Sequence, residues 1–212
     1  MANETERVSG PVGQLDVALS RVEGATSMVL VCHPHPLFGG TMDNKVVTTV
    51  AQAFTRLGHS AIRFNYRGVG GSEGQFDDSQ GEVADALAVA RYAIGELGID
   101  QIYLAGFSFG AYIAAKAALV LESEGLKVSG LLMVAPSILN SPFEQVTPLR
   151  LSQGQPVVVV MGDADEVVPF EEVEAWVLGH GHQFEWQPMA GVSHFFHRNL
   201  VPLREAIMSA FQ

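Results

Sequence analysis

Short runs of consecutive apolar residues alternate along this chain with longer segments in which apolar residues recur every three or four positions. The consecutive runs predict buried strands, and the longer spacing predicts helices with one buried face. The predicted strands are Gln14–Ser20, Ser27–His33, Ser60–Phe64, Ile102–Ala105, Gly130–Ala135, Pro156–Met161 and His182–Gln187. The predicted helices are Lys45–Leu57, Gly81–Leu97, Gly110–Leu121, Pro169–Leu178 and Arg198–Phe211.

The order of these elements indicates the fold class. Short apolar strands between amphipathic helices imply a mostly parallel sheet with helices on both faces, which is the α/β class. Gln14–Ser20 follows a Gly-Pro-Val-Gly turn, so an N-terminal hairpin is expected there. No repeat or linker divides the chain, and we expect a single domain over residues 1–212.

Charge and cysteine content narrow the partners and the compartment. The chain has 12 Lys and Arg against 23 Asp and Glu, a formal charge of −11, with no basic cluster. Nucleic acid and membrane are therefore not expected partners. The single cysteine, Cys32, allows no intrachain disulfide. No apolar signal segment opens the chain and no apolar run reaches the ~18 residues of a membrane span, so a cytoplasmic enzyme is expected.

One serine stands in the sequence context of a catalytic nucleophile. Gly106-Phe-Ser-Phe-Gly110 matches G-x-S-x-G, directly after a predicted strand and directly before an alanine-rich predicted helix. The flanking glycines suit a turn too tight for side chains, and the turn holds Ser108 at a helix N-terminus, where developing negative charge is favoured. The alternative is a serine that only caps this helix. The strand–turn–helix context favours Ser108 as the nucleophile.

A serine nucleophile needs a general base and a carboxylate that orients the base. The segment after the strand Pro156–Met161 offers Asp163 and Asp165, with Glu166 a third candidate. We favour Asp165, in the loop beyond the strand, and expect Asp163 to organise the turn through Asx-type bonds.

Two histidines near the C-terminus are candidates for the base. His194 lies in the loop after the last predicted strand, and His197 lies in the first turn of the closing predicted helix. The chain order Ser, acid, His is usual for this kind of site. We favour His194.

A tetrahedral intermediate needs two backbone N–H donors, one of them from the residue after the nucleophile. That donor is Phe109. The other lies in the segment His33–Gly40, where the prolines have no N–H to donate. Leu37 is the donor if His35 takes the place of the histidine in the usual His-Gly signature, and His35 is the donor if His33 does. We prefer Leu37.

His33 and His35 offer a second interpretation, because two histidines separated by one residue can bind a metal. Such a site needs further ligands at other strand ends. The expected H-x-H-x-D-H pattern is absent. We therefore expect neither a metal nor another cofactor.

Five segments, in the same order along nearly the whole chain, resemble small bacterial α/β hydrolases of the serine esterase and dienelactone-hydrolase-like kind. They are Cys32–Val47 (which contains His-Pro-His-Pro-Leu-Phe-Gly-Gly-Thr-Met), Arg63–Ser72, Leu104–Tyr112, Gly162–Pro169 and Ser193–His197. The resemblance implies the α/β-hydrolase fold with an eight-stranded sheet. It also implies a Ser-Asp-His triad, which matches Ser108, Asp165 and His194. Dienelactone hydrolases carry a nucleophilic cysteine instead, so dienelactone is not the expected substrate.

The interval Ser137–Gln155, where many α/β hydrolases insert a lid, has only 19 residues. We expect a lidless site that cleaves a small carboxylic ester or thioester through an acyl-Ser108 intermediate. A peptidase, amidase or acyltransferase with the same triad is one alternative. A non-catalytic binding protein on a hydrolase scaffold is another. The oligomeric state does not follow from the sequence.

Overall fold

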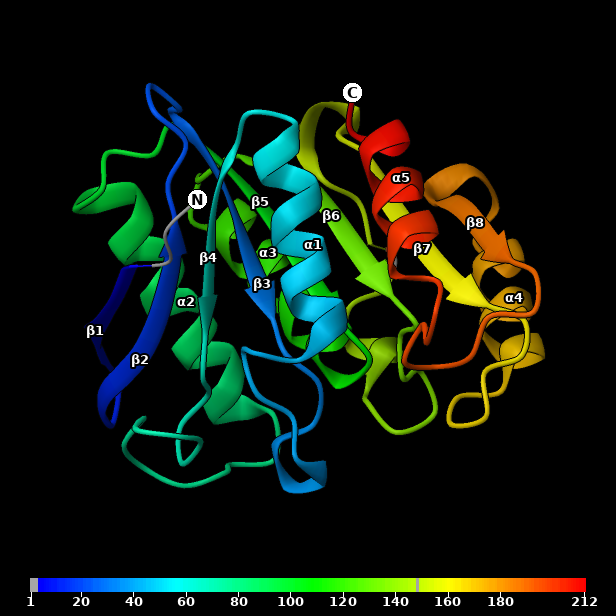
Figure 1. Ribbon diagram of the computed structural model, residues 1–212, viewed down its shortest axis with the longest axis horizontal. Helices are drawn as coiled ribbons and strands as arrows, with labels where there is room; N and C mark the ends of the chain where they lie inside the picture. Colours follow the sequence, from blue (N-terminus) through cyan, green and yellow to red (C-terminus); the bar gives the residue numbers. More distant parts are fainter. Residues whose placement is uncertain (1–3, 148) are drawn as a thin grey trace.

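The computed structural model describes residues 4–147 and 149–212. Eight strands form one sheet in the order β1-β2-β4-β3-β5-β6-β7-β8 (Figure 1). They are β1 Glu4–Gly10, β2 Gly13–Ser20, β3 Ser27–Cys32, β4 Ser60–Phe64, β5 Gln101–Phe107, β6 Val128–Val134, β7 Val157–Gly162 and β8 Glu185–Met189. The α-helices are α1 Lys45–Arg56, α2 Gln80–Gly95, α3 Phe109–Ser123, α4 Phe170–Gly179 and α5 Leu200–Ala210.

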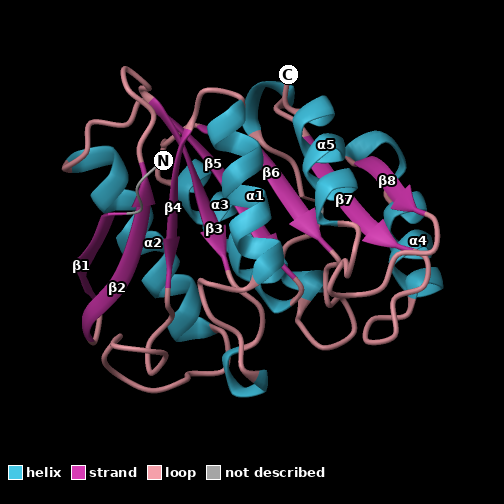
Figure 2. Cartoon of the chain, in the orientation of Figure 1, coloured by secondary structure: helices cyan, strands magenta, loops and turns pink. Residues whose placement is uncertain are grey.

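Six adjacent strands run parallel to one another, in the order β4-β3-β5-β6-β7-β8, whereas β1 and β2 are antiparallel to their neighbours. Every residue of β4, β6 and β7 is buried, which explains why apolar residues dominate these strands. Helices α1 and α5 pack together on one face of the sheet, and α2 and α3 on the other (Figures 1 and 2). The predicted α/β class, the mostly parallel sheet and the N-terminal hairpin are confirmed.

Two predicted boundaries are wrong for local reasons. The last strand begins at Glu185 instead of His182, because Gly181–Gln183 forms a 3₁₀ turn. The closing helix begins at Leu200 instead of Arg198, whose φ of 63° is left-handed and cannot continue an α-helix. His197 therefore lies in the preceding loop and not in the first helical turn.

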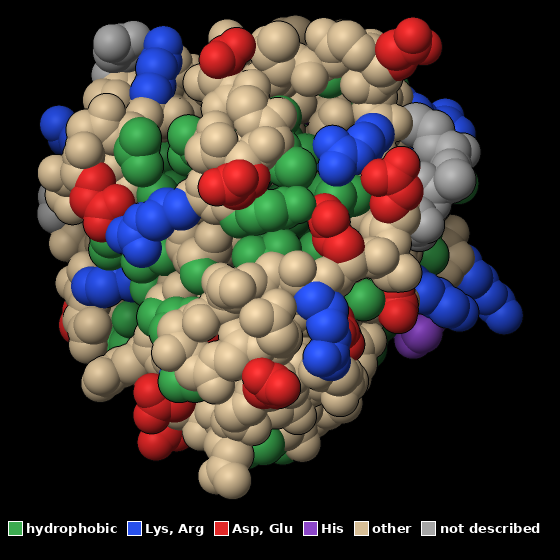
Figure 3. All heavy atoms as spheres, turned by 90° about the vertical axis from the view of Figure 1, so that its left-hand side faces the viewer, with side chains coloured by type: hydrophobic (Ala, Val, Ile, Leu, Met, Phe, Trp, Pro, Cys, Tyr) green, Lys and Arg blue, Asp and Glu red, His purple; other side chains and the backbone are tan. Residues whose placement is uncertain are grey.

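Strand β1 forms one edge of the sheet, and it is protected there by charge. Seen from this side, acidic and basic side chains are interspersed around hydrophobic ones (Figure 3). Arg7 pairs with Asp16 at 3.2 Å, and Arg21 pairs with Glu4 at 3.0 Å. Charged side chains on an edge strand disfavour pairing with another chain.

In the part of the chain that the structure describes, no helix is long and apolar enough to span a bilayer.

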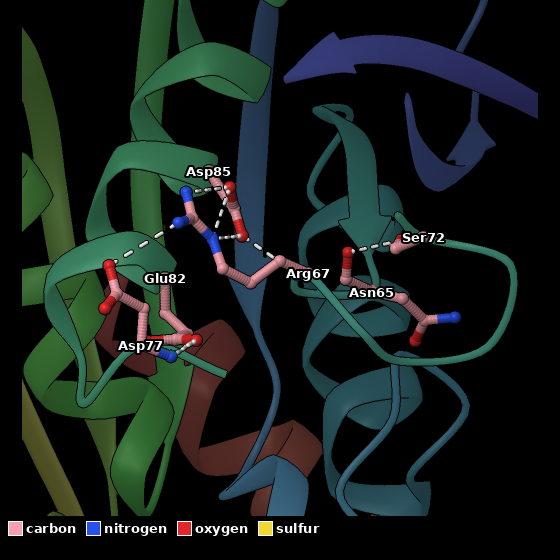
Figure 4. A network of polar contacts seen from close by, with 6 residues as sticks. All are labelled: Asn65, Arg67, Ser72, Asp77, Glu82 and Asp85. Atoms are coloured by element: carbon pink, nitrogen blue, oxygen red, sulfur yellow. Dashed lines mark hydrogen bonds and ion pairs between the residues drawn. The ribbon is translucent and has the colours of Figure 1, made fainter. Parts of the chain in front are cut away.

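A buried ion pair ties the loop after β4 to helix α2 (Figure 4). The backbone N–H and guanidinium of Arg67 donate four hydrogen bonds of 2.8 to 3.2 Å to the carboxylate of Asp85, which is fully buried. The guanidinium also lies 3.6 Å from Asp77. The Ser72 hydroxyl donates to the Asn65 carbonyl at 2.8 Å. These bonds hold the glycine-rich turn that follows β4 as a fixed backbone structure.

The carboxyl ends of β3, β5, β6, β7 and β8 meet at one edge of the sheet, at the lower side of Figure 1. Ligands bind at this edge in sheets of this kind. Loops leaving these strands carry every candidate residue of the predicted site.

Candidate active site

Ser108 occupies a sharp turn between β5 and α3. Its φ of 56° and ψ of −117° lie outside the regions that most residues adopt. A Cβ on Gly106 would lie 2.0 Å from the carbonyl oxygen of Gly110, and a Cβ on Gly110 would lie 2.4 Å from that of Cys32. Both glycines are therefore sterically required. The Ser108 side chain makes no capping hydrogen bond to α3, so the helix-cap alternative is not supported.

Asp165 and His194 form a buried hydrogen-bonded pair. His194 Nδ1 lies 2.7 Å from Asp165 Oδ2, and the two side chains are 3% and 0% exposed. The other carboxylate oxygen of Asp165 accepts the backbone N–H groups of Val167 at 2.8 Å and Val168 at 2.7 Å. Both carboxylate oxygens are thus used, and the one facing His194 holds the ring by its Nδ1.

Asp163 has a different role from the one expected. Its Oδ1 accepts the backbone N–H of Gly191 at 2.6 Å, which joins the loop after β7 to the loop after β8. The Asx-type bonds predicted for Asp163 belong to Asp165 instead. A second link between these loops was missed by sequence reasoning: Glu166 Oε2 accepts the backbone N–H of His194 at 3.1 Å. Only the tertiary contact reveals that Glu166 positions the backbone of His194.

The strand order brings His194 to the same edge as Ser108. The His194 ring centroid lies 4.9 Å from that of Phe107, the residue before Ser108. His197, in contrast, is exposed, and its backbone carbonyl accepts a hydrogen bond from Asn199. Of the two histidines proposed as the base, the structure therefore places only His194 against Asp165 and beside the turn that carries Ser108.

The geometry of the loop after β3 bears on the choice between Leu37 and His35 as the second oxyanion donor. The Leu37 N–H donates to His35 Nδ1 at 3.3 Å, within the 3₁₀ turn Pro36–Phe38, and the Leu37 side chain is 67% exposed. The His35 ring packs against the Phe109 ring with centroids 4.7 Å apart. Within residues 4–147 and 149–212, the His35 N–H donates no hydrogen bond. The His35 N–H is thus without a partner among the described residues, whereas the Leu37 N–H has one.

His33 fixes the position of this loop. Its Nδ1 lies 2.6 Å from the Pro34 carbonyl, and its Nε2 accepts the backbone N–H of Tyr66 at 3.2 Å. The Tyr66 hydroxyl donates in return to the His33 carbonyl at 3.2 Å. These bonds require a neutral ring protonated at Nδ1. Because both nitrogens are engaged, His33 has no lone pair for a metal, and the described residues contain no group of three metal-ligating side chains.

The hydrogen bonds that hold His33 neutral predict a pH dependence of the free energy of unfolding. Burial lowers the pKa of His33 from 6.5 to about 4. The unfolded chain therefore binds more protons than the native protein between these values, so stability is complete above pH 6.5 and falls as the pH drops towards 4. The loss from this residue is about 3 kcal/mol. His33→Gln removes the titrating group, and its free energy of unfolding should fall less over this range than that of the native protein.

Denaturant unfolding of both proteins at pH 7, 5.5 and 4 measures this difference. The variant is expected to be the less stable protein at pH 7, with the gap narrowing as the pH falls. Parallel pH profiles would show that His33 is not held neutral.

Comparisons with known proteins bear on the same geometry. The protein-family model for the alpha/beta hydrolase fold matches residues 29–155 of this chain. An uncharacterised protein of Rickettsia prowazekii is 30% identical over 209 residues, covering 94% of this chain and 84% of that protein. An α/β serine hydrolase homologue from Coxiella burnetii is 46% identical at a TM-score of 0.90, covering 100% of this chain and 99% of that one. A serine hydrolase without a lid from Xanthomonas campestris is 38% identical at a TM-score of 0.83, covering 99% and 94%.

Proposed function

Because this chain belongs to the α/β-hydrolase family, we propose that it hydrolyses a small carboxylic ester through an acyl-Ser108 intermediate. The hydrogen bond of 2.7 Å between His194 Nδ1 and Asp165 carries the proposal. It is buried at the sheet edge that also carries Ser108 in its strained turn. A scaffold that only bound a ligand would have no need to orient a histidine in this way beside a serine.

The proposed reaction begins with acylation of Ser108. His194 Nε2 takes the proton of the Ser108 hydroxyl while Oγ bonds to the ester carbonyl carbon, and the carbonyl electron pair moves onto oxygen. The N–H groups of Phe109 and His35 stabilise this oxyanion. The oxyanion collapses, the bond to the alcohol breaks, and His194 gives its proton to the departing oxygen.

A water molecule then repeats the sequence on the acyl-enzyme. It loses a proton to His194, bonds to the acyl carbon, and releases the carboxylic acid as the proton returns to Ser108. Asp165 keeps the proton of the neutral ring on Nδ1 and stabilises the imidazolium that forms in each half of the reaction. A thioester would react in the same way.

A fluorophosphonate tests the nucleophile directly, because it reacts with serines activated by a general base. The native protein should be labelled on the peptide that contains Ser108. The Ser108→Ala variant should not be labelled, and Asp163→Asn, which leaves the His194–Asp165 pair intact, should be labelled at a rate close to the native one. Labelling of another residue, or none, would contradict the proposal.

The absence of a lid predicts the preferred chain length. Between β6 and β7 the described residues form loops with only two 3₁₀ turns, Phe143–Gln145 and Ser152–Gly154. An open site leaves part of a long acyl chain in water, and each unburied CH₂ forgoes about 0.8 kcal/mol of binding. We expect the highest kcat/KM for short, soluble acyl esters.

A series of esters of one alcohol, with acyl chains of increasing length, measures this dependence of kcat/KM on chain length. Rates are followed at concentrations below and above the solubility limit of each substrate. No increase in rate is expected at that limit, because no lid has to open. A steady rise of kcat/KM to C12 and beyond would instead indicate a lipid-type substrate.

A further inference from the structure

A cavity of about 400 Å³ lies beside the helix that begins at the nucleophile. Its walls come from the beginning of α2, from α3 and from the loop after β6. They include Ser79 at the N-cap of α2, Tyr112 and Lys116 of α3, and Gln145 of the loop. None of these residues takes part in the chemistry proposed above.

Helix α3 connects this cavity with Ser108. Ser108 is the N-cap of the helix, and Tyr112 and Lys116 follow at intervals of four residues, which places them along one side of it. At the usual helical rise, Tyr112 lies about 6 Å and Lys116 about 12 Å along the axis from the nucleophile. Cα–Cβ bonds on a helix tilt towards its N-terminus, so the Lys116 side chain leaves the helix on the side of its own Cα that faces Ser108.

The cavity has a polar wall made of preordered groups. The buried Tyr112 hydroxyl donates to Gln145 Oε1 at 3.4 Å. Burial raises the pKa of Tyr112, so the hydroxyl stays neutral and available as a hydrogen-bond partner. At the rim, Asp78 and Ser79 both have left-handed backbones, with φ of 44° and 76°. Two successive strained residues that are not glycine are typical of functional sites.

Lys116 is the cation in the wall of this cavity. It is half-buried and forms no ion pair or hydrogen bond within residues 4–147 and 149–212. Two carboxylates lie nearby. Asp78 lines the cavity, and its negative charge acts to raise the pKa of His35. The negative charge of Glu144 acts to raise the pKa of Tyr112. Both are exposed and therefore hydrated and screened. Five other cations are paired with carboxylates: Arg7, Arg21, Arg63, Arg67 and Arg91. Among the described residues, the buried Nε of Arg204 has no hydrogen-bond partner either.

We propose that this cavity holds the acyl chain of the substrate and that Lys116 binds a carboxylate at the far end of that chain. The inference rests on the proposed ester hydrolysis at Ser108 and specifies its substrate class, which is the half-ester of a dicarboxylic acid. Tyr112 and Gln145 supply the polar contacts along the chain. The separation along α3 predicts that the carboxylate and the scissile carbonyl are joined by a spacer of several carbon atoms.

Three methyl esters with the same chain length test the charge. They are monomethyl adipate, its neutral analogue with a primary amide in place of the carboxylate, and methyl hexanoate. The native enzyme should hydrolyse the half-ester with a KM about tenfold below that of the amide, equivalent to about 1.4 kcal/mol. Lys116→Met should raise the KM of the half-ester about tenfold and leave methyl hexanoate unchanged, while Lys116→Arg should retain the preference.

Lys127→Met is the matched control. Lys127 is exposed just before β6, so its loss changes the net charge by the same amount without touching the cavity. It should leave all three KM values as they are. If Lys116→Met alters no KM, or alters all three equally, the inference is overturned, whereas Ser108-dependent hydrolysis of methyl hexanoate would still support the proposed function.

Labelling distinguishes the remaining outcomes. If none of the esters is hydrolysed and a fluorophosphonate does not label Ser108, the proposed function itself fails. If Ser108 is labelled, monomethyl adipate should slow the labelling of the native protein and not that of Lys116→Met. Labelling that the half-ester does not slow would overturn the inference alone.

Discussion

Replacing Ser108 with alanine is expected to lower kcat for ester hydrolysis by more than about 10³-fold, the usual scale for loss of a triad nucleophile. No acyl-enzyme bond can form without Oγ. The fold should persist, because the Ser108 side chain makes no capping bond and its backbone N–H still donates to the Val134 carbonyl, at 2.9 Å in the native protein. Alanine has the same Cβ in the same turn, so the backbone strain is unchanged. Initial rates together with thermal unfolding measure both effects.

Ser137→Ala provides the control for this experiment. Ser137 is also a buried serine at the same sheet edge, and its N–H donates to the Ser108 carbonyl. Its hydroxyl has no part in the proposed reaction, so activity should stay within tenfold of the native value. Comparable activity in the Ser108→Ala protein would end the serine-nucleophile hypothesis.

Asp165→Asn is expected to reduce kcat by up to about 10⁴-fold. The oxygen of the new amide would stay on the side where Asp165 Oδ1 accepts the N–H groups of Val167 and Val168. The amide NH₂ would then face His194 Nδ1 and require it to be an acceptor. The ring proton would move to Nε2, which could no longer take the proton of Ser108.

Asp163→Asn is the matched substitution, with the same chemical change two residues away. The asparagine oxygen can still accept the Gly191 N–H, which Asp163 accepts at 2.6 Å. We therefore expect less than a tenfold loss of activity. If Asp163→Asn were inactive and Asp165→Asn active, the orienting carboxylate would be misassigned.

The features that could be read from the sequence depend on neighbours along the chain. The turn at Ser108 is one, because two glycines, a strand and a helix all lie within a few residues of the serine. The buried strands are another, since a strand covered on both faces needs apolar residues throughout. Boundaries failed where one local conformation decided them, as the left-handed backbone of Arg198 shows.

The acid and the base were predicted from their positions after strands, but the roles of the residues around them were not. Glu166 and Asp163 both bond to the loop after β8, and no pattern near either residue shows such a contact. The choice between the two candidate oxyanion donors also depends on such contacts. Whether Leu37 or His35 has a free N–H depends on the rotation of the His35 ring and on its packing against Phe109.

The sequence by itself therefore determined the fold class, the elbow that carries Ser108 and the likeness to serine hydrolases, because these follow from local periodicity and from glycine, proline and serine at fixed spacings. Only the tertiary structure decided that the His35 ring packs against Phe109, how Arg67 and Asp85 hold the loop after β4, and that Lys116 lines a cavity beside the nucleophile helix. Each of these depends on side chains from different elements meeting in space, and hydrogen-bond geometry and burial exist only once the sheet has brought those elements together.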